Sequence, residues 1–311
     1  MSTSSCSTGS IKDIAEELRR KAGSIDVPCH CSLFVDIPSE LKDYVERLLS
    51  FPPAKVILID KFSVQFKHHD LLRLNSRVWL NDEVVNFFMK LFEERECTAA
   101  ASNMARKSNL FMNSFFYFKL TGSHGGFNYN NVKKWTKNQN VFSYNLIFIP
   151  INAANHWTMV CVSIPTREIM YLNSLSSLKD EGKTILMNIV MWLKLEFESK
   201  SLSGPFLDFN VKDVRCPQQL NTDDCGVFIL AYADLLSNEL DLDIMTQSLA
   251  DGVRKLIAFW IVRGYLVLSR VIASYFEESL HLRRSLRQLF KWLRYLGPLP
   301  CLLVIIATKK M

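Results

Sequence analysis

The spacing of apolar residues predicts a chain built from both helices and strands. Several segments place apolar side chains every three to four positions, which is the spacing that buries one face of an α-helix. We therefore expect helices at residues 11–21, 39–49, 83–95, 180–198, 225–236 and 248–267, and a short one at 132–137. Ser39, Asn81 or Asp82, and Asp223 or Asp224 stand where three of these helices need an N-terminal cap.

Strands are predicted where the residues are β-branched, aromatic or alternately apolar and polar. These runs are residues 56–59, 64–66, 115–120, 145–150, 156–164, 168–172 and 206–214. Pro165-Thr166 separates the fifth run from the sixth, so we expect these two strands to pair as a hairpin. Residues 97–109 are small and polar and predict a loop.

Composition favours one large domain, alone or with appendages. The chain has 311 residues, of which 49% are hydrophobic, and its net charge is +6. Residues 269–311 contain eight basic and two acidic side chains, and therefore carry the whole of that charge. The basic character belongs to the C-terminal segment, so we expect no nucleic-acid partner for the main domain.

The eight cysteines are scattered along the chain, and no spacing between them repeats. No N-terminal signal peptide is recognisable, so we expect a reducing, intracellular compartment. Cys29-His30-Cys31 has the residue types of a metal site, but no second pair follows at zinc-finger spacing. We therefore expect no metal there.

Cys225 is the cysteine with the features of a nucleophile. It follows the polar residues 216–224 and precedes the apolar run that predicts a helix. The helix dipole and the unpaired N–H groups at a helix start favour a thiolate, so we expect a lowered pKa for Cys225. A buried structural cysteine is the alternative.

A thiol nucleophile needs a base, a group that orients this base, and donors for the oxyanion. Of the six histidines, His156 is the one that opens a predicted buried strand. Asn173 ends the next predicted strand, and pairing would bring it beside His156 because adjacent strands lie about 5 Å apart. The alternatives are a structural histidine and an ordinary turn asparagine.

With these residues in place, the chain resembles the ubiquitin-like-protein-specific cysteine proteases, the SUMO (sentrin-specific) protease family. The resemblance extends from about residue 36 to residue 268. It is carried by Trp79-Leu80-Asn81-Asp82, Phe115-Phe116-Tyr117, Val132-Lys133-Lys134-Trp135, His156-Trp157, Tyr171-Leu172-Asn173-Ser174-Leu175-Ser176, Cys216-Pro217-Gln218-Gln219 and Asp224-Cys225-Gly226. It implies a papain-like α+β fold in which helices flank a central mixed sheet and the catalytic cysteine begins a central helix.

The resemblance also implies a role for each catalytic residue. Cys225 would be the nucleophile, and His156 the general base and acid. Asn173 would orient His156, at a position where the family usually has aspartate. Gln219 would donate its side-chain amide to the oxyanion, together with the main-chain N–H of Cys225.

Three further residues are implied to bind the substrate. Trp79 and Trp157 match an aromatic clamp that admits the thin Gly-Gly end of a modifier, and Asp70 matches an acidic residue that contacts the body of the modifier. Core packing is the alternative for the tryptophans, and a helix cap for Asp70. Thr222 stands where the family has glycine, and a positive φ there would strain threonine and displace Gln219.

The implied activity is cleavage after the C-terminal Gly-Gly of a SUMO-type modifier, in its precursors and in its conjugates to lysine. We expect a monomer without metal or organic cofactor, in the nucleus, at its periphery or in the cytoplasm. Three alternatives stay open: a binding module without activity, the same chemistry on ubiquitin or the neddylation modifier, and an acyltransferase.

The chain is expected to divide into three parts. We expect residues 1–35 to form a flexible arm with a helix and residues 36–268 to form the catalytic domain. Residues 269–311 are expected to form a basic, partly apolar extension. The extension would contact an acidic surface or membrane headgroups, or pack as an additional helix. Its apolar end, residues 299–307, is shorter than the roughly 20 residues that span a membrane.

Overall fold

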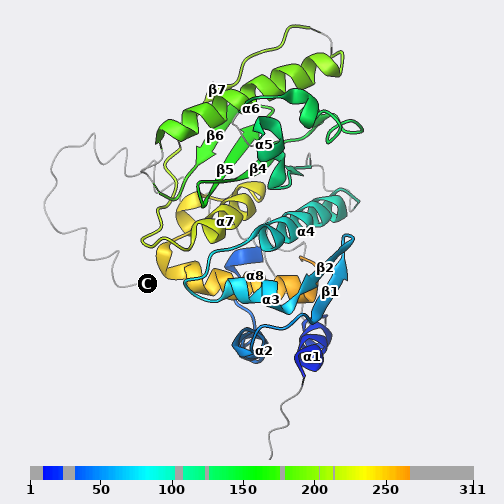
Figure 1. The fold of residues 1–311 in the computed structure, drawn as a ribbon, viewed down its shortest axis with the longest axis vertical. Helices are drawn as coiled ribbons and strands as arrows, with labels where there is room; N and C mark the ends of the chain where they lie inside the picture. The colour runs from blue at the N-terminus through cyan, green and yellow to red at the C-terminus, as the bar shows by residue number, and fades with distance from the viewer. Residues whose placement is uncertain are drawn as a thin grey trace, which may run out of the picture. The chain divides into compact units, whose positions relative to one another are not determined.

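A five-stranded mixed sheet with helices on both faces is the centre of the structure (Figure 1). The computed structural model describes residues 10–23, 32–101, 108–122, 126–175, 179–202, 204–212 and 214–266. All of these belong to one unit, Met1–Leu268, and the predicted basic extension lies outside the described residues. The α+β class and the mixed sheet are as predicted.

The sheet has the strand order β3-β4-β5-β6-β7. The central strands β4 (Leu146–Ala153), β5 (His156–Ser163) and β6 (Glu168–Leu172) pair antiparallel, which confirms the predicted hairpin. The short strands β3 (Leu110–Phe111) and β7 (Asn210–Val211) pair parallel at the two edges. A longer strand had been predicted around β7, but β7 has a single neighbour and both of its residues are exposed.

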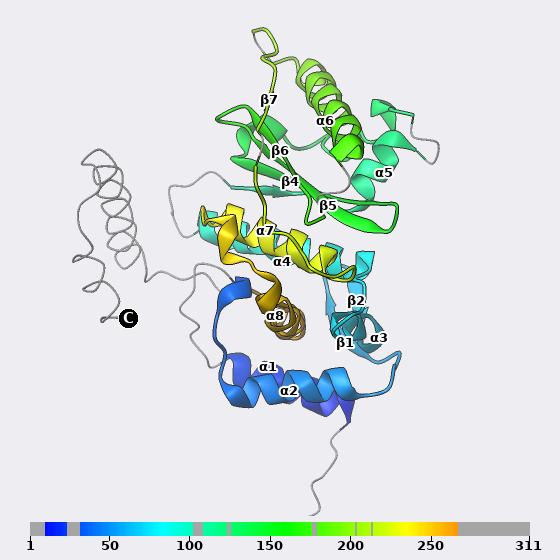
Figure 2. The ribbon, with the colours of Figure 1, turned by 90° about the vertical axis from the view of Figure 1, so that its left-hand side faces the viewer.

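Alternating side chains of the central strands build two separate cores, because successive residues of a strand point to opposite faces. One face packs against α5 (Phe115–Thr121) and α6 (Lys179–Ser199) through Ile147, Ile149, Val160, Val162 and Ile169. The other packs against the helices around α7 through Phe148, Met159, Cys161, Met170 and Leu172. Figure 2 shows the two helical layers on either side of the sheet.

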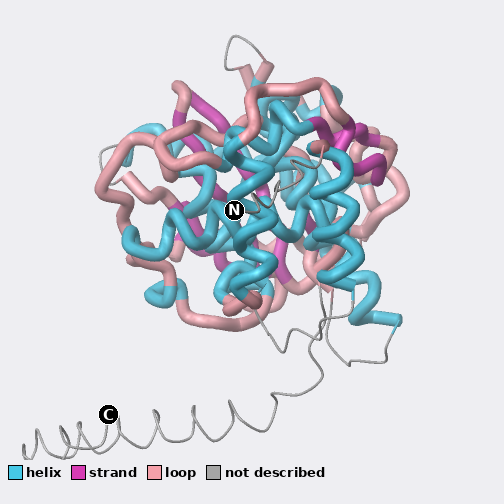
Figure 3. Tube along the Cα trace, turned by 90° about the horizontal axis from the view of Figure 1, so that it is seen from below, coloured by secondary structure: helices cyan, strands magenta, loops and turns pink. Residues whose placement is uncertain are grey.

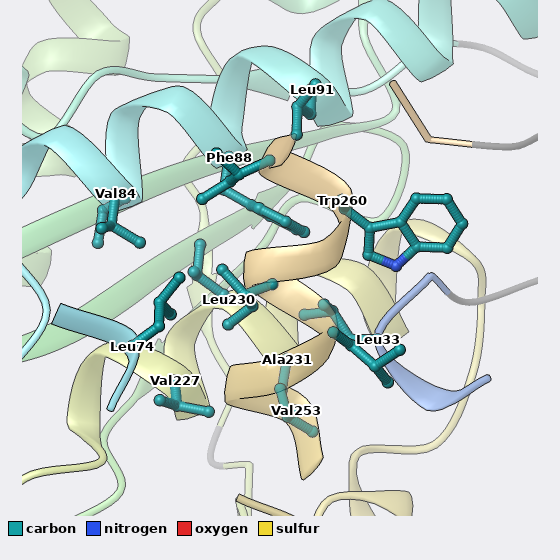
Figure 4. Packing of buried hydrophobic residues seen from close by; sticks show 14 of the residues in the cluster. Leu33, Leu74, Val84, Phe88, Leu91, Val227, Leu230, Ala231, Val253 and Trp260 are labelled. Carbon is teal, nitrogen blue, oxygen red and sulfur yellow. The ribbon is translucent and has the colours of Figure 1, made fainter. Parts of the chain in front are cut away.

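The second core is formed mainly by three helices, α4 (Asp82–Ala101), α7 (Cys225–Ser237) and α8 (Ala250–Arg263). Figure 4 shows side chains of this core, among them Val84, Phe88, Leu91, Val227, Leu230, Ala231, Val253 and Trp260. Almost every residue of α7 is buried, and the helix is apolar all round because it has neighbours on all sides. No helix among the described residues combines the length and the apolar character needed to cross a membrane.

The N-terminal part of the unit adds two helices and a hairpin. α1 (Ile11–Gly23) lies beside α2 (Ser39–Ser50), and both pack against α8 at the helical end of the unit (Figure 2). Figure 3 is seen from below, toward this end. Ile14, Ala15, Leu18 and Ala22 of α1 are buried in the common core. The hairpin of β1 (Ile57–Lys61) and β2 (Val64–Lys67) leads into α3 (His68–Leu71).

Several predicted elements differ from the structure. Residues 115–120 form helix α5 and not a strand: Phe116 and Leu120 are buried against the core at helical spacing, while Phe115 is exposed. α4 continues to Ala101 through part of the predicted loop, and residues 132–137 form turns.

Helix caps also differ in part. Asn81 or Asp82 is the predicted cap of α4, and the structure selects Asn81, whose Oδ1 accepts a hydrogen bond from the N–H of Val84 at 3.2 Å. Ser39 begins α2 without capping it, because Pro38 occupies the cap position and makes no side-chain hydrogen bond.

Candidate active site

Cys225 is the first residue of α7, as the sequence predicts. Asp224 occupies the cap position but makes no side-chain hydrogen bond to the helix, so the predicted capping role is wrong. The second residue, Gly226, has to be glycine because a Cβ there would lie 2.8 Å from Cβ of Leu80. The start of α7 is therefore in direct contact with the segment that carries Trp79.

The thiol of Cys225 is buried beside the first residues of β5. α7 packs against β5, and Cys225 lies in the same core as Trp157, the residue after His156. Burial raises the pKa of Cys225, and the N–H groups of Trp157, Gly226 and Cys225 offset this only in part. The expected lowering of this pKa is therefore wrong, because desolvation outweighs the donors at the helix start.

His156 and Asn173 are joined by a hydrogen bond, as the predicted hairpin requires. Nε2 of His156 lies 2.8 Å from Oδ1 of Asn173. The N–H of Leu175 also donates to Oδ1, at 2.8 Å, and this fixes the orientation of the amide because an NH₂ group does not accept such a bond. Nε2 of His156 must then carry a hydrogen, which leaves Nδ1 of the neutral ring to accept a proton.

Gln219 lies in the loop before Cys225, and both ends of its side chain are held. Its Oε1 accepts a hydrogen bond of 2.6 Å from the hydroxyl of Ser174, which is fully buried. Its Nε2 donates one hydrogen to the carbonyl oxygen of Asn221 at 2.7 Å. An amide nitrogen has two hydrogens, so one remains for a further acceptor. Ser174 thus fixes which end of the Gln219 amide offers N–H groups to the site.

The same loop is bound to the main chain of Asn173. The carbonyl oxygen of Asn173 accepts hydrogen bonds of 3.0 Å from the thiol of Cys216 and from Nε2 of Gln218. The hydroxyl of Tyr232 on α7 donates to the carbonyl oxygen of Pro217. The end of β6, the loop and α7 are therefore connected around the His156–Asn173 pair.

The two predicted clamp tryptophans have different environments. Trp79 is 45% exposed, and its Nε1 donates to Oδ1 of Asp223 at 3.2 Å. Trp157 is 2% exposed, lies in the core around α7, and donates from Nε1 to the carbonyl oxygen of Leu80 at 3.0 Å. Trp79 therefore offers a large aromatic surface, whereas the ring of Trp157 is packed.

Asp70 lies in α3. It is 9% exposed, and its Oδ1 accepts a hydrogen bond of 3.1 Å from Nδ2 of Asn81, while Nε2 of His69 lies 3.3 Å from Oδ2. It is not the cap of α3, because Lys67 occupies that position. Asp70 lines a polar surface hollow of about 650 Å³ with Asp60, Ser63, Gln65, Lys67, His69 and Glu83.

Thr222 does not have a positive φ, so the foreseen strain at this position does not arise. Its hydroxyl donates to Oδ1 of Asp223 at 3.0 Å. Gln219 is consequently not displaced by threonine in the loop. Cys29-His30-Cys31, which has the residue types of a metal site, lies outside the described residues.

Sequence analysis missed a buried ion pair directly behind Cys225. Nε of Arg254, on α8, donates to Oδ1 of Asp224 at 2.8 Å, and Arg254 is fully buried. Nδ2 of Asn221 and Nε2 of Gln247 each donate to Oδ2 of Asp224 at 2.7 Å. Burial raises the pKa of Asp224, but these hydrogen bonds and the charge of Arg254 outweigh burial and hold the pKa below its ordinary value.

The sequence contains a signal for Arg254 but none for Ser174. Arg254 falls on the apolar stripe of its helix, at helical spacing with Ala250, Ile257 and Ile261. A charge on such a stripe has to be paired, because an unpaired charge is costly in a core. Ser174 directly follows a strand, where serine is common in turns and has no special meaning.

Comparison with known proteins matches the part of the chain that holds the site. The family described as "Ulp1 protease family, C-terminal catalytic domain" matches residues 78–261, which include every site residue above except Asp70. Sentrin-specific protease 2 of Homo sapiens is 30% identical over 237 residues, which are 75% of this chain and 38% of that protein. The chain thus spans well under half of this relative.

Solved structures give the same match. The C-terminal Ulp1 protease domain in complex with Smt3, the yeast ortholog of SUMO, is 27% identical with a TM-score of 0.63, and the match covers 74% of this chain and 96% of that domain. The Chaetomium thermophilum Ulp1-like SUMO protease catalytic domain is 22% identical with a TM-score of 0.64, over 80% of this chain and 98% of that domain, which is a likeness of fold.

Proposed function

Because this chain belongs to the Ulp1 protease family, we propose that it is a cysteine protease that cleaves after the C-terminal Gly-Gly of a SUMO-type modifier. One observation carries the proposal. The Cys225 thiol is buried at the start of α7, which packs against β5, and the first residue of β5, His156, is held by Asn173 in the tautomer that can act as a base. The substrates would be modifier precursors and conjugates to lysine.

The reaction begins with transfer of the Cys225 proton to Nδ1 of His156. Burial raises the pKa of the thiol, so the proton leaves sulfur only as a base accepts it. The resulting imidazolium keeps its Nε2–H directed at Oδ1 of Asn173. The thiolate then attacks the carbonyl carbon of the last glycine and forms a tetrahedral oxyanion.

The oxyanion is stabilised by donors that are already in place. We assign these donors to the second N–H of Gln219 and to the main-chain N–H of Cys225 at the start of α7. Ser174 holds the Gln219 amide from its oxygen end, so its nitrogen end is oriented before substrate arrives. Donors fixed in this way need no reorganisation during the reaction.

Collapse of the tetrahedral species breaks the carbon–nitrogen bond. His156 donates its proton to the departing amine, which is an α-amine in a precursor and a lysine ε-amine in a conjugate. The modifier stays on Cys225 as a thioester. His156 then takes a proton from water and the hydroxide attacks the thioester carbon. The carbon–sulfur bond breaks, the modifier leaves with a free C-terminal carboxylate, and Cys225 regains its proton from His156.

We assign substrate selection to Trp79. The buried Trp157 would support the segment that carries Trp79, because its Nε1 donates to the carbonyl oxygen of Leu80. The exposed ring of Trp79 would cover the extended Gly-Gly end. Glycine would fit beneath the indole because it has no side chain. Asp70 would contact the body of the modifier from the polar hollow beside α3.

Probes that carry an electrophile at the modifier C-terminus test this function. The wild-type chain is expected to form a covalent adduct with a SUMO-type probe, and Cys225→Ala none, by mass spectrometry. A parallel panel with ubiquitin and the neddylation modifier tests the choice of modifier. Tight binding of SUMO without any adduct would contradict the protease and leave a binding module.

A further inference from the structure

Trp79 and Cys225 come from distant parts of the sequence but are connected through one buried guanidinium. Nη1 of Arg254 donates to three carbonyl oxygens in the segment that leads to Trp79. These belong to Arg73, Asn75 and Val78, at 3.2, 3.1 and 2.9 Å. The main chain before Trp79 is therefore fixed from within the core.

The other nitrogens of Arg254 bind the residues directly before Cys225. Nη2 donates to the carbonyl oxygen of Asp223 at 2.9 Å and lies 2.7 Å from Oδ1 of Asp224, which also accepts from Nε. A guanidinium is planar and rigid, with five N–H donors. One group thus binds both segments and sets the distance between them.

A second connection joins the same segments at the surface. Nε1 of Trp79 donates to Oδ1 of Asp223, which also accepts from the hydroxyl of Thr222. Because the ring of Trp79 is half exposed, core packing alone does not fix its rotamer. The carboxylate of Asp223 therefore orients the indole relative to Cys225, two residues further along the chain.

Two side chains that precede Arg254 contact the same two segments. Gln247 lies in the short 3-10 helix Gln247–Leu249 before α8, and Asp251 lies in the first turn of α8, three positions before Arg254. Oε1 of Gln247 accepts from the N–H of Leu220 at 2.7 Å, and Oδ1 of Asp251 accepts from the hydroxyl of Ser76 at 2.7 Å. The contacts of Arg254, the Trp79–Asp223 bond, and the contacts of Gln247 and Asp251 thus all restrict the positions of the segment before Trp79 and of the loop before Cys225.

We propose that Arg254 and Asp223 are positioning residues that set the gap between the Trp79 ring and the Cys225 loop, and thereby the fit of the Gly-Gly end. The inference rests on the proposed function, because Trp79 has a substrate to cover only if the chain binds such a modifier. A gap of fixed width matters because an indole that is already oriented loses less conformational freedom when the Gly-Gly end binds, which lowers KM.

The test is a double-mutant cycle on the Trp79–Asp223 hydrogen bond. Asp223→Ala and Trp79→Phe each remove the bond, and each is expected to raise KM for a C-terminal fluorogenic SUMO-type substrate about three- to tenfold, with kcat changed less than about twofold. The double variant should be no worse than either single one, because both act through one bond. Asp223→Asn keeps an acceptor oxygen and should restore KM.

Arg254→Lys tests the buried part of the network. Lysine keeps the positive charge but lacks the planar fork, so KM should rise at least as much as in Asp223→Ala. Iodoacetamide alkylation of Cys225 should stay within about twofold of wild type, since the charge near the thiol is retained. Asp208 is an exposed aspartate before β7, so Asp208→Ala is the matched control for Asp223→Ala and should have the KM of the wild type. If Arg254→Lys does not fold, the double-mutant cycle of Trp79 and Asp223 still tests the proposal.

Two outcomes would overturn the inference. One is an unchanged KM in Asp223→Ala; the other is multiplication of the two single effects in the double variant. The cycle is also measured by urea unfolding, which needs no substrate. If the wild-type chain cleaves no modifier but the two substitutions shift the unfolding midpoint non-additively, the proposed function fails and the connection between Trp79 and Asp223 stands.

Discussion

At the scale of single residues, the orientation of one amide determines the chemistry of the site. The N–H of Leu175 fixes Oδ1 of Asn173, and Oδ1 in turn fixes the hydrogen on Nε2 of His156. An aspartate would accept the same two hydrogen bonds and would add a charge that stabilises the imidazolium. Asparagine therefore supplies the orientation but not the charge, as in cysteine proteases of the papain type.

Asn173→Asp is expected to keep or raise kcat/KM for a SUMO-type substrate, because both acceptor positions are retained. Asn173→Ala is expected to lower it about 10- to 150-fold, which corresponds to loss of a hydrogen bond to a charged group. Steady-state cleavage of a fluorogenic modifier substrate measures both. A severe loss in Asn173→Asp would show that Asn173 does not orient His156.

Ser174→Ala is expected to lower kcat about three- to tenfold with little change in KM. The hydroxyl of Ser174 holds Oε1 of Gln219, and an oxyanion donor acts in the transition state and not in substrate binding. Gln219→Ala should cost about 10²- to 10³-fold in kcat. Ser50→Ala, at the exposed last residue of α2, is the control. A rise in KM alone for Ser174→Ala would contradict the positioning role.

At the scale of elements, the start of α7 combines Cys225, the proposed nucleophile, with a buried ion pair. Asp224 does not cap the helix and instead binds Arg254 of α8, Asn221 and Gln247. The helix start, and with it Cys225, is therefore held in place by a neighbouring helix. Removing one partner of such a pair usually lowers the free energy of unfolding by about 3–5 kcal/mol, because the other charge is left unpaired in the core.

Asp224→Asn is therefore expected to lower the free energy of urea unfolding at neutral pH. The pKa of Asp224 in the folded chain lies below the ordinary 3.8, so its stabilising contribution is fully present above that pH and is lost as the pH falls toward the folded value. The difference between wild type and Asp224→Asn should consequently shrink below pH 3.8. A difference that grew on acidification would contradict a carboxylate stabilised by Arg254.

At the scale of the whole described unit, the N-terminal helix is part of the core. α1 packs against α2 and α8, and α8 carries Arg254, so the segment that precedes the matched family region supports a helix of the site from behind. Residues 10–23 of the predicted arm are thus packed, although the arm, domain and extension boundaries stay predictions.

Leu18→Ala is expected to destabilise the chain by about 2–5 kcal/mol, because Leu18 is fully buried between helices. Glu16→Ala, on the exposed side of the same helix, should change the free energy of unfolding by less than about 0.5 kcal/mol. Urea unfolding measures both. Equal, small effects would mean that α1 is not packed against α8 in solution.

The sequence by itself determined the central hairpin and the helix that begins at Cys225, and it narrowed the cap of α4 to Asn81 or Asp82. These features depend on short-range periodicity and on chemistry within a few residues. The pairing of His156 with Asn173 followed from the hairpin as well, since strand pairing brings the ends of two consecutive strands together.

Only the tertiary structure decided the features that depend on distant neighbours. Residues 115–120 became a helix because one side of the run packs into the core beside α6, which local β-propensity does not reveal. The pKa of Cys225 rises because burial outweighs the helix start. Arg254 reaches Asp224 and the segment before Trp79 across about 30 and 180 positions of sequence, and such contacts arise from packing, which a linear pattern does not encode.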